Sequence, residues 1–438
     1  MSFRKQYILA ILAASITSIA KADSSGYLQT NLVSDDPSFN PQIIDPHMVN
    51  AWGIALRPPG AGGHIWISND RDGTSSEYIG DVPGNPLHQD GLKVVNLDIA
   101  GFADKGYASV TGQAYNAASD LAGQATEFPV SGPAHDLTTT PPTSLGTVTG
   151  SAKFVFVTKD GTINAWRSNT ATAMDSAPVV VDYSKTGHFP AIDAANPDFS
   201  GVAISTNPVT STNPVDGNHV YATDFHNNRI EVFNNQWQDI SPSVSQDPNQ
   251  TIAFQTPATV GDLHPFNVVD LNHHLYVTYA MFDPNSDEGF EDVPGFGHLV
   301  EYNEDGSLAK DFTGGDLDSP WGIAVAPSTF GKFANDVLVA NFGNDGTIAA
   351  FDPATGNFID DLRDADGNVL NIDGVWGLAF GNGVSLGDAN SLYFTAGPNG
   401  EQDGLFGKLT VVPEPCTTAL MLISATCAVA TRRRRCYK

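Results

Sequence analysis

A short phrase recurs along the chain: an aromatic residue, then glycine, an aliphatic residue and alanine. It occurs at Trp52–Ala55, Trp321–Ala324 and Trp376–Ala379, and degenerate copies begin at Phe199 and Phe266. Phe266 and Trp321 are 55 residues apart, as are Trp321 and Trp376. A period of about 50 residues is typical of repeat folds in which each unit is one small sheet.

The segments between these phrases have the character of strands. Short β-branched and aromatic runs alternate with clusters of Gly, Asn, Asp and Pro, and no long apolar stripe of helical period is present. The runs are 64–68, 153–158, 219–223, 274–278, 337–340 and 391–395. Asp-Gly pairs at 160–161 and 345–346 supply tight turns, since glycine accepts a positive φ without steric cost. The pattern therefore indicates antiparallel hairpins.

Repeat and hairpins together predict an all-β fold, a six-bladed β-propeller of four-stranded antiparallel blades. The units open near residues 50, 111, 198, 264, 319 and 374, and the second carries a long insertion over 117–150. The last unit has only three strands of its own, 375–380, 391–395 and 405–412. We expect Tyr27–Val33 to supply the fourth and close the ring. Two β-sandwiches are the alternative, and they explain the regular repeat poorly.

The N-terminus predicts export. Arg4 and Lys5 precede a mostly apolar stretch, and Ala20 and Ala22 form a small-x-small cleavage site, which is the layout of a secretory signal peptide. The chain therefore divides into a signal peptide over 1–22, the propeller over 23–412 and a tail over 413–438.

The tail has three parts in order: a Pro-Glu-Pro box, an apolar run over 417–430 and a basic end. The run of about 14 residues makes a helix of roughly 21 Å, which is short for a bilayer core of about 30 Å. We therefore expect a short transmembrane helix that retains the protein transiently and keeps its basic end in the cytoplasm. The box and the basic end consist of Pro413, Glu414, Pro415, Arg432, Arg433, Arg434 and Arg435. The three cysteines all lie in this tail, so the propeller has no disulfide.

This tail resembles the bacterial PEP-CTERM sorting signal. Motifs such as Asn31–Asp35, Asp45–Ile54, Thr158–Ile163 and Phe394–Pro398 add a resemblance to an uncharacterised family of exported bacterial β-propeller proteins that carry such tails. The resemblance implies an exosortase-type processing enzyme as partner and delivery to the cell envelope, cell surface or extracellular matrix. It implies contact with the membrane only through the C-terminal helix. It brings no known activity and therefore no catalytic residue.

Charge excludes one class of partner. The formal net charge is −28, and such a surface repels phosphate backbones, so we expect no nucleic-acid binding. Extracellular polysaccharide or another envelope protein remains open as a partner.

Two sets of residues are candidates for a site. Polar residues around the first strands of the blades are expected to converge on the central channel: His47, Asn50, Gln113, Asp224, His226, His264, Asn267, Asp318 and Asp373. Asp283, Asn285 and Asp287 place oxygen atoms at alternate positions of one loop and are the candidate metal ligands, with Ca²⁺ as the cofactor. A solvated acidic loop, and channel residues that serve only backbone groups and water, are the competing interpretations.

Two functions follow. A non-catalytic binding or interaction module, with an unidentified ligand, fits the absence of a recognisable catalytic motif. The alternative is a cation-dependent hydrolase or lyase with its site in the central channel, where the cation would polarise a substrate carbonyl.

Overall fold

The computed structural model describes residues 24–100, 105–120, 126–136, 139–169, 172–183, 197–205, 217–242, 251–286, 289–343 and 345–413. The predicted signal peptide, including Ala20 and Ala22, lies outside these ranges. So does the predicted tail from Glu414 onward, which leaves Pro413 as the last described residue.

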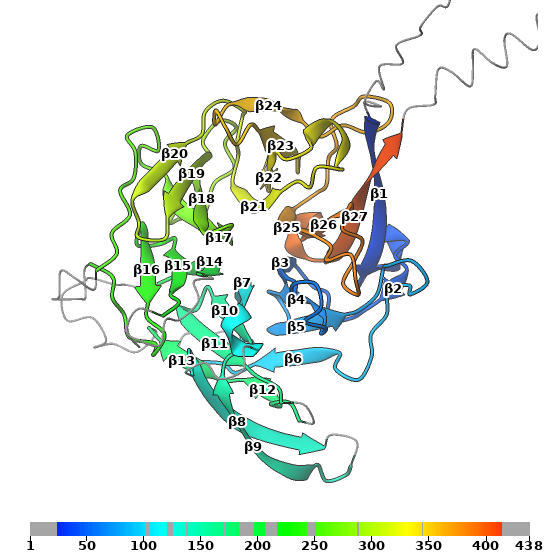
Figure 1. The fold of residues 1–438 in the computed structure, drawn as a ribbon, viewed down its shortest axis with the longest axis vertical. Coiled ribbons are helices and arrows are strands. Elements are labelled where there is room, and N and C mark those ends of the chain that lie inside the picture. The colour runs from blue at the N-terminus through cyan, green and yellow to red at the C-terminus, as the bar shows by residue number, and fades with distance from the viewer. Residues whose placement is uncertain are drawn as a thin grey trace, which may run out of the picture.

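Six sheets are arranged radially around one axis (Figure 1), so the predicted six-bladed propeller is confirmed. We number the blades one to six in chain order. Their innermost strands are β3 (Ala51–Ala55), β7 (Val110–Tyr115), β14 (Phe199–Ile204), β17 (His264–Leu271), β21 (Pro320–Val325) and β25 (Val375–Phe380). Each begins within a few residues of the predicted start of its unit.

The outer strands follow in chain order within each blade. In blades one to three they are β4 (Ile65–Asn69), β5 (Thr74–Tyr78), β6 (Val94–Leu97), β10 (Phe154–Thr158), β11 (Thr162–Trp166), β13 (Val179–Asp182), β15 (Val220–Asp224) and β16 (Arg229–Phe233). In blades four to six they are β18 (His274–Ala280), β19 (His298–Asn303), β20 (Leu308–Asp311), β22 (Val337–Asn341), β23 (Ile348–Phe351), β24 (Phe358–Asp361), β26 (Leu392–Ala396) and β27 (Leu405–Pro413).

The blades are not all four-stranded antiparallel sheets. Blade three has three strands among the described residues, β14, β15 and β16. Blade one gains β12 (Ser176–Ala177) and blade six gains β2 (Ile43–Ile44), and both short strands pair in parallel with the outermost strand of the sheet.

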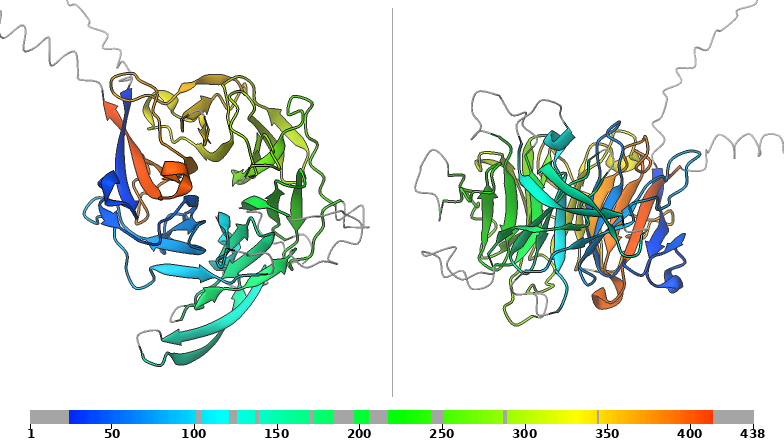
Figure 2. Two further views of the ribbon diagram at one scale, coloured as in Figure 1. Left: turned by 180° about the vertical axis from the view of Figure 1, so that it is seen from behind. Right: turned by 90° about the horizontal axis from the view of Figure 1, so that it is seen from below.

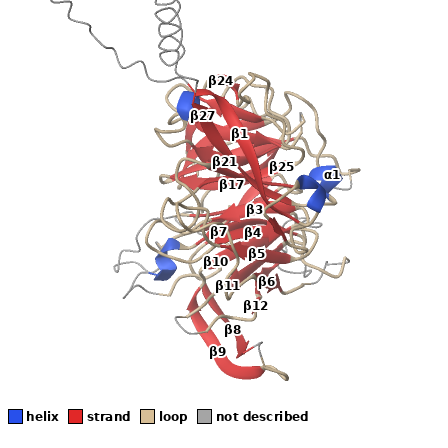
Figure 3. Ribbon diagram, turned by 90° about the vertical axis from the view of Figure 1, so that its right-hand side faces the viewer, coloured by secondary structure: helices blue, strands red, loops and turns tan. Residues whose placement is uncertain are grey.

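The ring is closed by the first strand, as predicted. β1 (Ser24–Ser34) pairs antiparallel with β27, in a register that runs from Ser24 opposite Pro413 to Ser34 opposite Leu405. The two strands lie side by side at the outside of blade six (Figures 1 and 3). Blade six is therefore built from both ends of the chain.

The insertion in the second unit forms a hairpin. β8 (Pro129–Asp136) and β9 (Thr143–Ser151) extend from the rim beside blade two (Figure 2). Alternate residues of β8, among them Val130 and Ala134, are buried in the same core cluster as Val148 of β9. The hairpin is thus an extension of the core of blade two.

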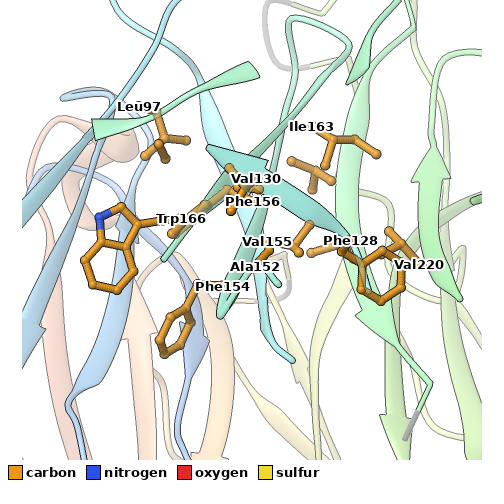
Figure 4. Packing of buried hydrophobic residues seen from close by; sticks show 14 of the residues in the cluster. Leu97, Phe128, Val130, Ala152, Phe154, Val155, Phe156, Ile163, Trp166 and Val220 are labelled. Atoms are coloured by element: carbon orange, nitrogen blue, oxygen red, sulfur yellow. The ribbon is translucent and has the colours of Figure 1, made fainter. Parts of the chain in front are cut away.

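Most second strands are buried on both faces because each blade packs between two others. β10 has no exposed residue, and its Phe154 and Phe156 lie with Trp166 of β11 in one cluster (Figure 4). Trp66 of blade one stacks on Phe154 with ring centroids 4.0 Å apart. Burial on both faces accounts for the continuous apolar runs in the sequence, because a strand buried on one face only would alternate apolar and polar residues.

Helices are short. They are η1 (Pro37–Phe39), η2 (Ala117–Asp120), η3 (Gly331–Phe333) and α1 (Pro398–Glu401). Over the described ranges, no helix has the length and apolarity needed to cross a membrane.

Candidate functional site

The repeated phrase brings neighbouring inner strands into close contact. Five of the six inner strands carry a glycine that faces the next blade closely: Gly53, Gly112, Gly201, Gly322 and Gly377. A Cβ atom on Gly53 would lie 2.6 Å from the carbonyl oxygen of Thr111, and one on Gly377 would lie 2.8 Å from that of Trp52. Glycine recurs here because any side chain would push the next blade away.

Asn267 of blade four is the exception to the glycine rule. Its Nδ2 donates a 2.8 Å hydrogen bond to the carbonyl oxygen of Trp321 in blade five. The asparagine joins two blades by a hydrogen bond at the position where the other blades are in direct backbone contact.

Four of the five aromatic residues that begin the phrase meet across the axis, Trp52, Phe266, Trp321 and Trp376. Trp52 of blade one stacks on Trp376 of blade six with ring centroids 3.9 Å apart, and lies 6.2 Å from Trp321 of blade five. Trp321 Nε1 donates to the carbonyl oxygen of Ser200, two blades away, at 2.9 Å. We call this cluster the aromatic plug, and it consists of Trp52, Phe266, Phe290, Trp321, Phe342 and Trp376. Contacts between blades that are not neighbours show that it fills the centre of the channel.

Beyond the plug, the second halves of the inner strands enclose a cavity of about 880 Å³, which we call the funnel. All six inner strands contribute to its wall. The apolar lining includes Ile54, Ile204, Val269, Ile323, Leu378 and Phe380. The volume falls within the range of small-molecule binding sites, about 300–1,000 Å³.

Two of the predicted channel residues, Gln113 and Asn267, line the funnel. Gln113 Nε2 donates to the carbonyl oxygen of Gly53 at 3.0 Å, and its Oε1 accepts from the Ser75 hydroxyl at 2.9 Å. Both side chains therefore link blades, in agreement with the interpretation that channel residues serve backbone groups.

The charged residues of the funnel were not among the predicted ones. Arg57 follows β3 and lies with its guanidinium carbon 5.3 Å from the ring centroid of Tyr115. Asp270 lies on blade four, and its Oδ1 accepts a 3.1 Å hydrogen bond from the backbone N–H of His273. The available signal was position: Arg57 comes two residues after the phrase Trp52–Ala55, where the inner strand ends.

Several other predicted residues lie at the opposite end of the inner strands, where the chain enters them. Asn50 is fully buried, and its Oδ1 accepts a 3.0 Å hydrogen bond from Trp376 Nε1 beneath the plug. His47 Nδ1 donates to Asp72 at 2.8 Å, and Asp373 accepts from the backbone N–H of Asn399 at 2.9 Å. Asp318 is buried beside Asn341, whose Oδ1 accepts from its backbone N–H.

The remaining predicted residues belong to the same end, at blades three and four. His264 Nδ1 donates to the carbonyl oxygen of Phe225 at 2.6 Å, and burial lowers the pKa of His264. His226 contacts Phe282 edge-to-face. Burial raises the pKa of Asp224, although hydrogen bonds from Asn227 oppose the shift. The plug thus divides the predicted set between the two ends of the channel, because residues before and after the phrase lie on opposite sides of it.

The candidate calcium loop is only partly described, since Asp287 lies outside the described ranges. Asp283 Oδ1 accepts hydrogen bonds from the backbone N–H and the Nδ2 of Asn285, at 2.8 Å and 3.0 Å. The residues that the structure describes contain no group of three or more His, Cys, Asp or Glu side chains arranged to hold a metal ion. The calcium site stays a prediction.

Three uncharacterised proteins of Acanthamoeba polyphaga mimivirus are similar in sequence. One is 29% identical over 368 residues, which cover 83% of this chain and 76% of the viral protein. A second is 34% identical over 44% of this chain and 49% of its own length, and a third is 30% identical over 54% and 39%. No protein-family model matches the chain.

Solved structures that resemble the chain include the Dos1 propeller, at 8% identity and a TM-score of 0.37 over 84% of this chain and 70% of that one. The structure of U3-55K is 9% identical with a TM-score of 0.38 over 89% and 100%. At such low scores the blade count rests on the strand pairing described above.

These comparisons correct the predicted resemblance to an exported bacterial PEP-CTERM family, which is wrong. The similar proteins found are viral and uncharacterised. Three of the motifs quoted for that resemblance, Asp45–Ile54, Thr158–Ile163 and Phe394–Pro398, lie on or beside blade strands, where packing constrains the sequence, so they do not identify a lineage. The exosortase partner followed from the same resemblance, and no observation on the described residues tests it.

Proposed function

We propose that the protein is a non-catalytic binding module and that the funnel takes up the apolar part of a ligand. The observation that carries the proposal is the convergence of six inner strands on one cavity of about 880 Å³ with a predominantly apolar wall. Apolar walls with a few placed polar groups are typical of small-molecule sites.

The chemistry of the lining supports binding over catalysis. The described lining residues include no histidine, cysteine, serine, threonine, lysine or glutamate. General acid–base catalysis needs a group whose pKa lies near the working pH, and nucleophilic catalysis needs an activated hydroxyl, thiol or amine. Asp270 is the only acid among these residues, whereas Ca²⁺ takes six to eight oxygen ligands. The funnel therefore suits the cation-dependent hydrolase poorly.

We also predict that the protein is exported, and this prediction is separate from the binding function proposed for the funnel. The signal-peptide pattern at residues 1–22 motivates it, and the presence of the protein outside producing cells would be the direct test. Extracellular polysaccharide and envelope proteins remain untested as partners.

A neutral, environment-sensitive dye such as Nile red tests the funnel in the full chain. We expect saturable binding that Leu56→Gln weakens by about tenfold or more, because Leu56 lines the funnel and an apolar side chain contributes about 1.5–3 kcal/mol on burial. Leu308→Gln is the matched control, since Leu308 is 42% exposed on β20. Absence of binding to the wild-type protein, or equal effects of the two substitutions, would overturn the proposal.

A further inference from the structure

Each inner strand of the propeller has one unpaired edge. In the sheet of every blade the innermost strand is the last in the order of hydrogen-bonded strands, so its second edge faces the axis of the ring (Figure 1). A free strand edge presents backbone N–H and C=O groups without a ladder partner. Strands with such edges make up the wall of the funnel.

The hydrogen bonds of blade five identify the backbone groups that face the axis. The backbone N–H of Ala326 donates to the carbonyl oxygen of Asp336, at 2.9 Å, in the direction of β22. In an antiparallel pair, successive residues direct their backbone groups alternately toward the partner strand and away from it. Val325, the preceding residue, therefore directs its N–H and C=O groups away from β22 and toward the axis, and Ile323 does the same.

Closer to the plug, backbone groups on the same edges have partners. The carbonyl oxygen of Trp321 accepts from Asn267 Nδ2 at 2.8 Å, and that of Ser200 accepts from Trp321 Nε1 at 2.9 Å. At Val325, farther along β21, the outward N–H and C=O groups have no hydrogen-bond partner among the residues that the structure describes. Val325 lines the funnel and is half-buried, so these groups need water or a ligand as partner.

The side chains of the wall do not supply a charge for a ligand. Gln113 and Asn267 are engaged between blades. Arg57 and Asp270 each take part in further interactions within the protein. The funnel therefore combines an aliphatic wall with free backbone edges, and this combination fits an uncharged ligand that carries both donors and acceptors.

We propose that the ligand is an uncharged, apolar peptide segment that pairs with the inner edge of β21. This inference rests on the proposed binding function. A residue in extended conformation directs its N–H and C=O groups to the same side, and it can exchange two hydrogen bonds with Val325 as in an antiparallel sheet. Its apolar side chains contact the aliphatic wall, so main-chain bonds and side-chain burial act together, as in other cases of strand addition.

A capped tripeptide, acetyl-valyl-leucyl-valine amide, tests the proposal on the full chain, beside an analogue in which the nitrogen of every amino acid is methylated. Binding is followed by displacement of Nile red and by calorimetry. The methylated analogue is more apolar, so burial alone predicts that it binds more tightly. Strand pairing predicts that it binds about twofold to tenfold more weakly for each hydrogen bond lost. The uncapped peptide, charged at both ends, should bind most weakly, because binding removes water from its charges.

A substitution in β21 assigns the pairing to this edge. Val325→Pro removes an outward N–H and leaves the bonds to β22 in place, which is the position that a strand tolerates for proline. We expect it to weaken binding of the capped peptide by about twofold to tenfold and to leave the affinity for Nile red unchanged. Val325→Ala is the matched control, since it alters the same side chain and keeps the N–H, and it should leave the affinity for the peptide unchanged.

The outcomes separate the two proposals. The inference is overturned, and the binding module stands, if Nile red binds but the capped peptide does not displace it. The same holds if the methylated or the uncapped peptide binds at least as tightly as the capped one, or if Val325→Pro keeps the full affinity for the peptide. Should Val325→Pro fail to fold, as judged by circular dichroism, the two capped peptides on the wild-type protein decide. If neither Nile red nor the peptide binds, the proposed function itself fails.

Discussion

The aromatic plug should carry a large share of the stability of the ring, and Trp376→Ala measures it. The Trp376 side chain is fully buried, with stacked contacts to Trp52 at 3.9 Å and Phe342 at 4.1 Å between ring centroids. Removing a buried tryptophan costs about 3–5 kcal/mol through lost transfer free energy and the cavity left behind. The substitution also leaves the buried Asn50 Oδ1 without the donor Trp376 Nε1, and such a loss costs about 1–3 kcal/mol. Because the two contributions overlap, we expect the free energy of unfolding to fall by about 4–6 kcal/mol.

Urea denaturation of the full chain, followed by circular dichroism, gives this difference from the midpoint and slope. Trp237→Ala is a matched control: Trp237 is only half-buried, and its Nε1 also donates one hydrogen bond, to the carbonyl oxygen of Pro129 at 2.9 Å. Both variants lose the same atoms and one indole hydrogen bond, so their difference reports burial in the plug. We expect the control to lose about 1–2 kcal/mol, in proportion to its burial. A difference between the variants below about 1 kcal/mol would refute the argument that the plug holds the blades together.

Three further outcomes follow from the geometry. Gly53→Ala should lower the free energy of unfolding by about 1–3 kcal/mol, because the new methyl group would lie 2.6 Å from the Thr111 carbonyl oxygen. Gly91→Ala has no atom within 4 Å of its Cβ and should be neutral or slightly stabilising in the same urea assay. Equal effects of the two substitutions would contradict the close contact of the blades. Leu32→Ala should cost about 2–5 kcal/mol, since Leu32 is fully buried in β1, and a cost below 1 kcal/mol would show that β1 does not hold blade six closed. Burial, and to a smaller extent the nearby Asp90, raise the pKa of the fully buried Glu77 well above its ordinary value of 4.5, with His64 as the other ionisable group nearby. The folded protein therefore keeps this proton to a higher pH than the unfolded chain, and the associated stability is complete below about pH 4.5 and is lost as the pH rises toward the raised value. Glu77→Gln should accordingly gain stability over the wild-type protein between pH 5.5 and pH 8.5, and a constant difference across this range would contradict the raised pKa.

The sequence predicted the blades well because blade packing leaves local marks. Glycine on the inner strand reflects its close contact with the next blade, and that contact recurs in five of the six blades, so the period was visible in residues such as Gly322 and Gly377. The closing role of β1 followed from counting: the last unit has three strands of its own, and a propeller does not leave a long sheet edge unpaired.

The site was predicted less well, since its features depend on which end of an inner strand a residue occupies. Asn50 and Gln113 both lie on or next to an inner strand, yet the plug separates them, and no local pattern shows that tryptophans from blades one, five and six meet at the axis. Arg57 escaped notice because a single arginine after a strand is unremarkable in sequence. The position of Arg57 in the funnel wall depends on contacts with Tyr115 and Asn382, which the fold brings to it from blades two and six.

The pairing of β1 with β27 also determines how the ring can be tethered. Ser24 and Pro413 are register partners at the outer edge of blade six, so any extension at either end departs from a single point on the circumference. A linker or fusion domain attached there would hold the disc by its perimeter and leave both openings of the channel accessible. Proteolytic removal of β1 would, conversely, break its pairing with β27 and open the ring at blade six.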